Sequence, residues 1–224
     1  MLNRVQRYKK YFKYTTYTYQ DTLLIEEKRF LGKDTSDITI SWTKKYQYNN
    51  SLLMRESMYD RNNQEYFRQE YIYDSRGNKV EISIAEWNEG KFDVTVREMY
   101  LYDENNLLIN EKTFINDEIS SQKTYEYDNK HFLVQKVDYL KVDGILQPGS
   151  KITYENNPQG QSIRELLYSN IDFKGQFILG SKLTRTYDDM GNLTSTTHMA
   201  LFEGVWYPLP DSDERWIYYF VPVK

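Results

Sequence analysis

Polar and apolar residues alternate along short runs of this 224-residue chain, and turn-forming residues separate the runs. Lys79–Ile84 alternates polar and apolar side chains, and Phe92–Val96 alternates in the same way. A period of two is typical of a half-buried β-strand. The segments Ser75–Asn78 and Asn88–Lys91 border these runs and contain Gly and Asn, which tolerate the positive φ of tight hairpin turns. The pattern therefore predicts strand, turn, strand, turn over Tyr71–Asp103.

This unit recurs along the chain, and each copy contains a tyrosine followed closely by Asp, Asn or Leu-rich residues. Successive copies begin 25 to 33 residues apart, which is the range of a repeat architecture. We expect the repeated tyrosines to take equivalent places on one face of a sheet, near one rim, with their rings stacked as a ladder. These structural anchors are Tyr19, Tyr48, Tyr73, Tyr102, Tyr127, Tyr154 and Tyr187.

A second set of turns falls midway between the anchors, and aromatic residues flank several of them. Trp87 and Phe92 border one such turn, and Trp206 follows another. Aromatic residues paired across a hairpin clamp its turn, and this structural role is the interpretation that we prefer. Exposed rings also stack on sugars, so the alternative is a ligand-binding role for four residues. They are Trp87, Trp206, Tyr207 and Trp216.

These patterns predict an all-β fold, an antiparallel β-meander of repeated hairpins that forms one long twisted or coiled sheet. We expect about fourteen strands of ordinary length, and right-handed strand twist favours the coiling. The alternative is a closed barrel or a sandwich around a small aromatic core. No linker or low-complexity segment divides the chain, so we predict a single domain over residues 1–224.

An open meander has two edge strands, here expected near Val5–Thr15 and Arg215–Val221. Lysines in the first segment protect an edge from pairing with other chains. The run Trp216–Phe220 carries no charge and has strong β propensity, which favours pairing. The sequence therefore predicts that a partner strand adds at the C-terminal edge. Alternatively, the loop Phe202–Asp213 covers this strand.

The motif Tyr-Asp-x-x-Gly-Asn at Tyr73–Asn78 and Tyr187–Asn192 resembles the signature of YD-repeat, or Rhs-like, bacterial proteins. The tips Trp87…Phe92 and Gly204–Trp206 resemble a variant common in secreted and cell-surface proteins of gut-type bacteria. Other units depart from the motif, since Tyr127 lacks the glycine. The resemblance implies a β-sheet meander that is exported from the cell, and it provides no catalytic residues to transfer.

Composition agrees with a folded but thinly packed β protein. Aromatic residues make up 16% of the chain, with 22 tyrosines, while 28% of residues are charged. A high tyrosine content explains how the chain can be both aromatic and polar, because tyrosine has an apolar ring and a polar hydroxyl. The net charge is −4, whereas nucleic-acid-binding proteins are typically basic. We therefore expect no nucleic acid as a partner. Basic and aromatic residues do alternate before Thr15, but an edge strand explains them more simply.

The sequence contains no recognisable catalytic or metal-binding motif. There are no cysteines and only two histidines, His131 and His198. The turn carboxylates Asp74 and Asp103 lie near Asn residues, but they lack the spacing of a calcium loop, and turn capping explains them. No apolar run approaches the roughly 18 residues of a membrane span. The first residues contain no apolar segment, so we predict no signal peptide in this chain.

We therefore expect a non-enzymatic, exported module of the cell surface or periplasm with a structural or interaction role. We expect no cofactor and no metal. The alternative from another class is a glycan-binding module that uses exposed aromatic residues. Partners are a protein or a glycan at the cell surface, and the oligomeric state is left open.

Overall fold

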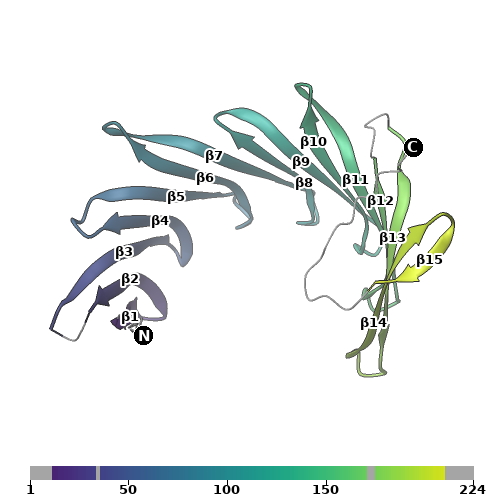
Figure 1. Ribbon diagram of the computed structural model, residues 1–224, viewed down its shortest axis with the longest axis horizontal. Helices are drawn as coiled ribbons and strands as arrows, with labels where there is room; N and C mark the ends of the chain where they lie inside the picture. Colours follow the sequence, from purple (N-terminus) through teal and green to yellow (C-terminus); the bar gives the residue numbers. More distant parts are fainter. Residues whose placement is uncertain (1–11, 34–35, 171–174, 210–224) are drawn as a thin grey trace, which may run out of the picture. The chain divides into compact units, whose positions relative to one another are not determined.

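A computed structural model describes residues 12–33, 36–170 and 175–209, and every regular element among them is a β-strand (Figure 1). The fifteen strands pair in chain order, β1 to β15, as one antiparallel sheet. Among the described strands, β1 and β15 are the two ends of that order, so the sheet is not closed into a barrel. The prediction of an all-β meander is confirmed, and the alternative of a closed barrel or sandwich is wrong.

The strands belong to two compact units, residues 1–98 with 115–117 and residues 99–114 with 118–224. The first unit contains β1 Phe12–Gln20, β2 Leu23–Gly32, β3 Ile38–Asn49, β4 Leu52–Asp60, β5 Glu65–Tyr73, β6 Lys79–Asn88 and most of β7 Lys91–Tyr102. The second contains most of β8 Leu108–Ile115, then β9 Glu118–Tyr127, β10 Leu133–Val142, β11 Ile145–Asn156, β12 Ser162–Ser169, β13 Ile178–Tyr187, β14 Leu193–Phe202 and β15 Val205–Pro208. That residues 1–224 fold as one domain stays a prediction.

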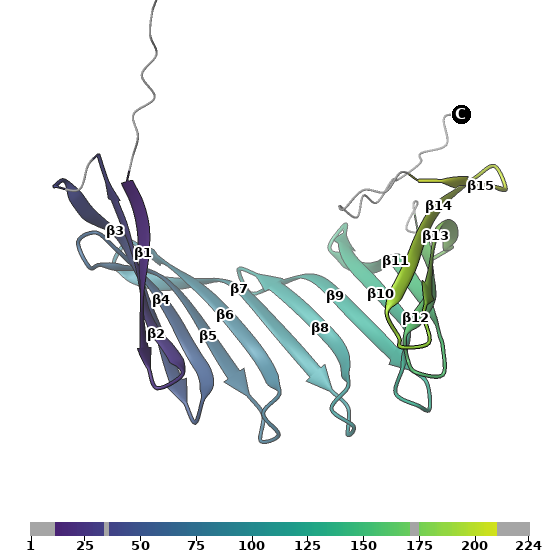
Figure 2. The same ribbon diagram turned by 90° about the horizontal axis from the view of Figure 1, so that it is seen from below.

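Within each unit, the turns that follow odd-numbered strands lie at one rim and those that follow even-numbered strands lie at the other (Figure 2). Several turns contain two residues, and both of them have positive φ, as Glu89 (47°) and Gly90 (95°) do. This is the type I′ hairpin, whose backbone twist matches that of the flanking strands. Asn, Asp and Gly at these places explain the turns. The same geometry occurs at Asn50-Ser51, Asn116-Asp117, Asp143-Gly144 and Glu203-Gly204.

Six other turns contain five residues and share one hydrogen-bond pattern. The first residue is Asp or Asn, and its side-chain oxygen accepts the backbone N–H groups of the third and fifth residues over 2.7–3.1 Å. The fourth residue always has positive φ, and in one turn that residue is His131. These turns span residues 60–64, 74–78, 103–107, 128–132, 157–161 and 188–192. The repeated turn carboxylates thus cap the backbone N–H groups of their own turns.

Few side chains are buried among the residues that the structure describes. In the first unit Tyr71, Ile82 and Ala85 are the buried apolar residues, and in the second they are Val137 and Ala200. Such a thin core agrees with strands whose two faces are both partly polar. The sheet is consequently held by contacts between neighbouring strands rather than by a second layer.

Several predicted features lie outside the described residues. These are Trp216, the edge strand Arg215–Val221, most of the edge segment Val5–Thr15 and the end of the loop Phe202–Asp213.

Candidate functional site

Two tyrosines at the end of β5 bind the strand beside them. Tyr73 donates a hydrogen bond from its hydroxyl to the carbonyl oxygen of Leu53 on β4, over 2.9 Å. Tyr71 lies two residues earlier, on the same face of the sheet, and donates to Oε1 of Glu56 over 2.7 Å. Glu56 lies three residues after Leu53. We call this set of two donors and two acceptors a rung.

The rung recurs three times, each time inside one unit and each time with the glutamate three residues after the carbonyl. On β3, Tyr46 and Tyr48 bind Glu27 and the carbonyl of Leu24 over 3.3 and 3.0 Å. On β9, Tyr125 and Tyr127 bind Glu111 and the carbonyl of Leu108 over 3.0 and 2.9 Å. On β13, Arg185 and Tyr187 bind Glu165 and the carbonyl of Ser162. The rungs therefore join odd-numbered strands to the even-numbered strands before them.

These bonds replace the ladder of stacked rings that the sequence predicted. Successive anchors lie on every second strand, about 10 Å apart, which is beyond the reach of direct ring stacking. Tyr48, Tyr73, Tyr127 and Tyr187 instead use their hydroxyls. Tyr102 lies at the corresponding end of β7.

One anchor was aligned incorrectly in the sequence. The turn after β11 begins at Asn157, which caps it, so Asn156 takes the place that Tyr73 has before Asp74. The side-chain amide of Asn156 donates to the carbonyl of Leu133 over 2.8 Å, as an anchor does. Tyr154 lies two residues farther from its turn, at the place that corresponds to Tyr71.

Two of the four rung carboxylates also bind lysines. Glu56 pairs with Lys44, and Glu111 pairs with Lys123 over 2.6 Å. Burial and the bond to Glu56 raise the pKa of the Tyr71 hydroxyl, and burial and Glu111 do the same for Tyr125. These hydroxyls therefore remain protonated donors. A catalytic tyrosine base needs a shift in the opposite direction.

A second polar cluster lies on the opposite face of β4 and β5. Glu65 accepts hydrogen bonds from Arg55 (2.7 Å), Ser57 (2.7 Å) and Arg68 (3.1 Å). Burial by itself raises the pKa of Glu65, but the hydrogen bonds from Arg68, Ser57 and Arg55 outweigh it and lower the pKa to about 2. The cluster joins the two strands from this face as the rungs do from the other.

Substituting Glu65 should reduce the pH dependence of the free energy of unfolding at acidic pH. The folded-state pKa of about 2 lies below the ordinary value of 4.5, so the ionised form stabilises the fold above pH 4.5 and this contribution disappears as the pH falls toward 2. Glu65→Gln should lower the free energy of unfolding by up to about 3 kcal/mol at pH 7. In urea titrations, its difference from the wild type should shrink between pH 5 and pH 2. Glu70→Gln is the control because Glu70 is half exposed and lies 3.8 Å from Arg55; an equal effect there would contradict the assignment.

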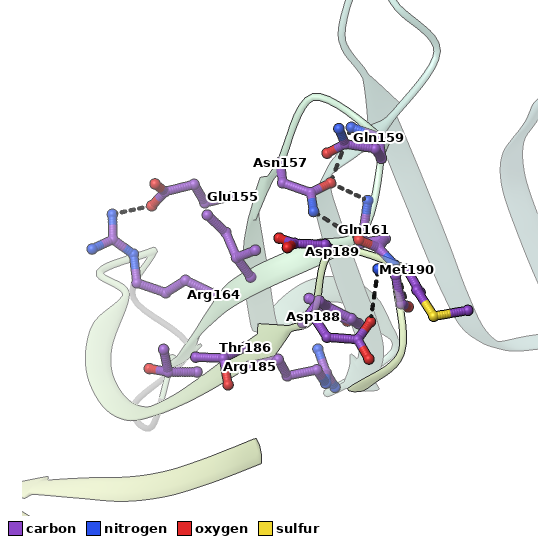
Figure 3. Close-up of a pocket in the computed structure, with 14 residues that line it drawn as sticks. Glu155, Asn157, Gln159, Gln161, Arg164, Arg185, Thr186, Asp188, Asp189 and Met190 are labelled. Carbon is purple, nitrogen blue, oxygen red and sulfur yellow. Dashed lines mark hydrogen bonds and ion pairs between the residues drawn. The ribbon is translucent and has the colours of Figure 1, made fainter. Parts of the chain in front are cut away.

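A groove of about 850 Å³ in the second unit lies between the turns 157–161 and 188–192 (Figure 3). Several of its polar groups are engaged in bonds between strands and turns. Gln161 donates to the carbonyl of Gly191 over 2.8 Å, and Glu155 pairs with Arg164. The Asn192 side chain lowers the pKa of Asp188 by hydrogen bonding, so this carboxyl is held as an anionic turn cap.

The predicted aromatic ligand residues fall into separate places. Trp87, in the first unit, is 41% exposed and contacts Phe92 edge-on with a ring separation of 5.2 Å. Trp206, in the second unit, has the ammonium of Lys182 over its ring at 4.5 Å. Tyr207 follows it and is half exposed. The structure therefore offers Trp87 as the more accessible indole.

The described part of the chain contains no group of three or more His, Asp or Glu side chains placed to hold a metal ion. It also contains no helix of the length and apolarity needed to cross a membrane.

Comparison with known proteins gives only distant similarity. No family model and no curated protein matches the chain. Among solved structures, a DUF3836 family protein from Parabacteroides distasonis is 16% identical, with a TM-score of 0.30 over 36% of this chain and 73% of that one. A TcdB2-TccC3-TEV structure is 16% identical, with a TM-score of 0.43 over 83% of this chain and 11% of that one. A porin-like protein from Bacteroides uniformis is 14% identical, with a TM-score of 0.43 over 87% of this chain and 85% of that one.

Proposed function

We propose that the chain is a non-enzymatic repeat scaffold that presents an interaction surface outside the cytoplasm, at the cell surface or in the periplasm. The rungs carry the non-enzymatic part of this proposal. The extracytoplasmic part rests on the resemblance of Tyr73–Asn78 and Tyr187–Asn192 to the YD-repeat signature.

Two of the four rung carboxylates, Glu56 and Glu111, use both of their oxygens for structure. In Glu56, Oε1 accepts the hydroxyl of Tyr71 and Oε2 pairs with Lys44. In Glu111, Oε1 pairs with Lys123 and Oε2 accepts the hydroxyl of Tyr125. A general acid or base must exchange a proton with a substrate, and these carboxylates are instead saturated by fixed donors. Their recurrence at equivalent positions indicates a role in stacking the repeats.

Incubating the purified chain with libraries of glycans and peptides tests this proposal. Mass spectrometry should show that no library member is converted, while affinity capture retains one or more of them unchanged. Glu56→Gln and Glu111→Gln should lower the thermal midpoint. Turnover of any library member that is lost in either variant, with the fold intact, would contradict a scaffold role.

A second candidate function, glycan binding, is favoured by the surroundings of Trp87. The guanidinium of Arg68 lies 3.9 Å from the centre of the Phe92 ring, and Phe92 in turn supports Trp87. An exposed ring held in this way loses little conformational entropy on binding.

Trp87→Ala should reduce the signal of the retained sugars on a glycan array by at least about tenfold, as truncation of a central aromatic contact does. Trp206→Ala is the matched control, because Lys182 already covers that ring. Circular dichroism should show both variants folded. An unchanged signal in Trp87→Ala would exclude this site, and loss confined to Trp206→Ala would move it to the second unit.

A further inference from the structure

Strand β1 carries the donor pair of a rung without the acceptors. Tyr17 lies opposite Glu27 and Tyr19 opposite Leu24, with a bulge after Thr18. Strand β3 pairs with β4 in the same manner, with Tyr46 opposite Glu56, Tyr48 opposite Leu53 and a bulge after Gln47. Tyr17 and Tyr19 are therefore the structural equivalents of the two rung tyrosines of β3.

The side chains of the two tyrosines of β1 are also exposed to solvent. Tyr17 is 55% exposed and Tyr19 is 58% exposed, whereas the rung residue Tyr71 is 7% exposed. Neither hydroxyl has a hydrogen bond to a described residue. In each rung the acceptors come from the even-numbered strand before the donors, and β1 is the first of the described strands. The edge of β1 therefore presents half of an interface that the rest of the fold completes four times.

The four acceptor strands show what completes a rung. Each presents a carbonyl, then an apolar residue, a polar residue and a glutamate. The segments are Leu24-Ile25-Glu26-Glu27, Leu53-Met54-Arg55-Glu56, Leu108-Ile109-Asn110-Glu111 and Ser162-Ile163-Arg164-Glu165. An added strand of this pattern supplies a carbonyl to Tyr19 and a carboxylate to Tyr17, besides main-chain hydrogen bonds along the edge.

We propose that the edge of β1 that faces away from β2 binds an extended segment of a partner protein with the pattern Leu-apolar-polar-Glu, which adds as an antiparallel strand. A partner protein is the proposed source because the four rung segments already hold neighbouring strands and residues 1–11 contain no glutamate. The sequence favoured the opposite edge, at Arg215–Val221, which lies outside the described residues. The last described strand, β15, contains Pro208, which has no N–H to donate to an added strand.

This site is separate from the aromatic group at Trp87 and goes beyond the proposed function. A peptide of residues 50–60, NSLLMRESMYD, reproduces β4 and contains one glutamate. With a fluorescent label, it should bind the full chain saturably in anisotropy titrations. The same peptide with Glu56→Gln should bind several-fold more weakly, because Tyr17 then donates to a neutral amide oxygen instead of a carboxylate.

Variants of the full chain locate the binding. Tyr17→Phe and Tyr19→Phe keep the rings and remove the hydroxyls, so each should weaken binding of the peptide several-fold. Tyr14→Phe is the control on the same strand, because Tyr14 is exposed and stacks on Phe30 outside the pair. Amide exchange should slow along β1 when the peptide is bound.

The proposal is overturned if the peptide does not bind, or if it binds equally well with Gln at position 56. Equal binding to Tyr17→Phe, Tyr19→Phe and the wild type would also overturn it. Self-association that blocks the peptide and depends on Tyr17 would assign the edge to a second copy of the chain instead. If the peptide does not bind but the Tyr17→Phe variant still retains sugars on a glycan array, the β1 proposal fails while the proposed function stands.

Discussion

Replacing Tyr71 with alanine should lower the free energy of unfolding by about 4 kcal/mol, in the range found for buried aromatic truncations. Tyr71 is the aromatic residue of the buried core in the first unit. Its ring lies under the ammonium of Lys79 at 4.8 Å, and its hydroxyl binds Glu56. The variant loses apolar burial, a cation–π contact and one of the donors to a half-buried carboxylate.

Tyr71→Phe separates the ring from the hydroxyl. It should cost about 1.5 to 3 kcal/mol, the usual contribution of a hydrogen bond to a charged group. Tyr66→Ala is the matched control, because Tyr66 lies on the same strand with 39% of its surface exposed, and it should cost less than about 1 kcal/mol. Urea unfolding followed by tyrosine fluorescence and circular dichroism measures all three. Equal losses for Tyr71→Ala and Tyr66→Ala would contradict the role of Tyr71 in the core.

Gly160→Ala should be the most damaging single substitution in the five-residue turns, with a loss of about 3 kcal/mol or more. The residue has φ of +81°, and left-handed backbone costs an L-residue about 1 to 2 kcal/mol. An added Cβ would also lie 2.5 Å from Cε1 of Phe132, in the preceding five-residue turn. Relieving that overlap requires the ring to move, which costs a further 1 to 3 kcal/mol or so.

Gly77→Ala isolates the backbone contribution. Gly77 occupies the same place in its turn with φ of +85°, and a Cβ there meets nothing within 4 Å. It should therefore cost only about 1 to 2 kcal/mol. Phe132→Ala combined with Gly160→Ala should show a favourable coupling, since the first change removes the obstacle to the second. Thermal and urea unfolding of the wild type, the single variants Gly77→Ala, Gly160→Ala and Phe132→Ala, and the double variant provide the comparison. Equal losses at Gly77 and Gly160 would mean that Phe132 does not pack on the turn.

The candidate site was only half visible in the sequence. The Tyr-x-Tyr pairs were recognised as repeat anchors, but their glutamate partners were not. A signal was present, because a glutamate follows three residues after the acceptor position in β2, β4, β8 and β12. The distances along the chain hide it: the donors lie 14, 15, 19 and 20 residues after their glutamates. Unequal hairpin lengths make these spacings irregular.

The misalignment of Tyr154 has the same origin. A tyrosine followed by Glu155-Asn156-Asn157 looks like an anchor with a longer turn. In the structure Asn157 caps a turn of ordinary length, and Asn156 performs the hydrogen bonding of an anchor. A short amide side chain substitutes for a tyrosine there because both reach a carbonyl on the neighbouring strand.

Local chemistry determined the strands and the turns of this protein. Alternation of side chains depends on neighbours two residues apart, and positive φ depends on a single Gly, Asn, Asp or His, so both were legible in the sequence. Tertiary structure decided which hydroxyl meets which carboxylate, and among the described residues it leaves Tyr17 and Tyr19 of β1 without rung acceptors. Those outcomes depend on the register between strands and on the bulges near Tyr19 and Tyr48. Register arises from pairing over the whole length of two strands, and a shift of one residue would turn every donor of a rung to the opposite face.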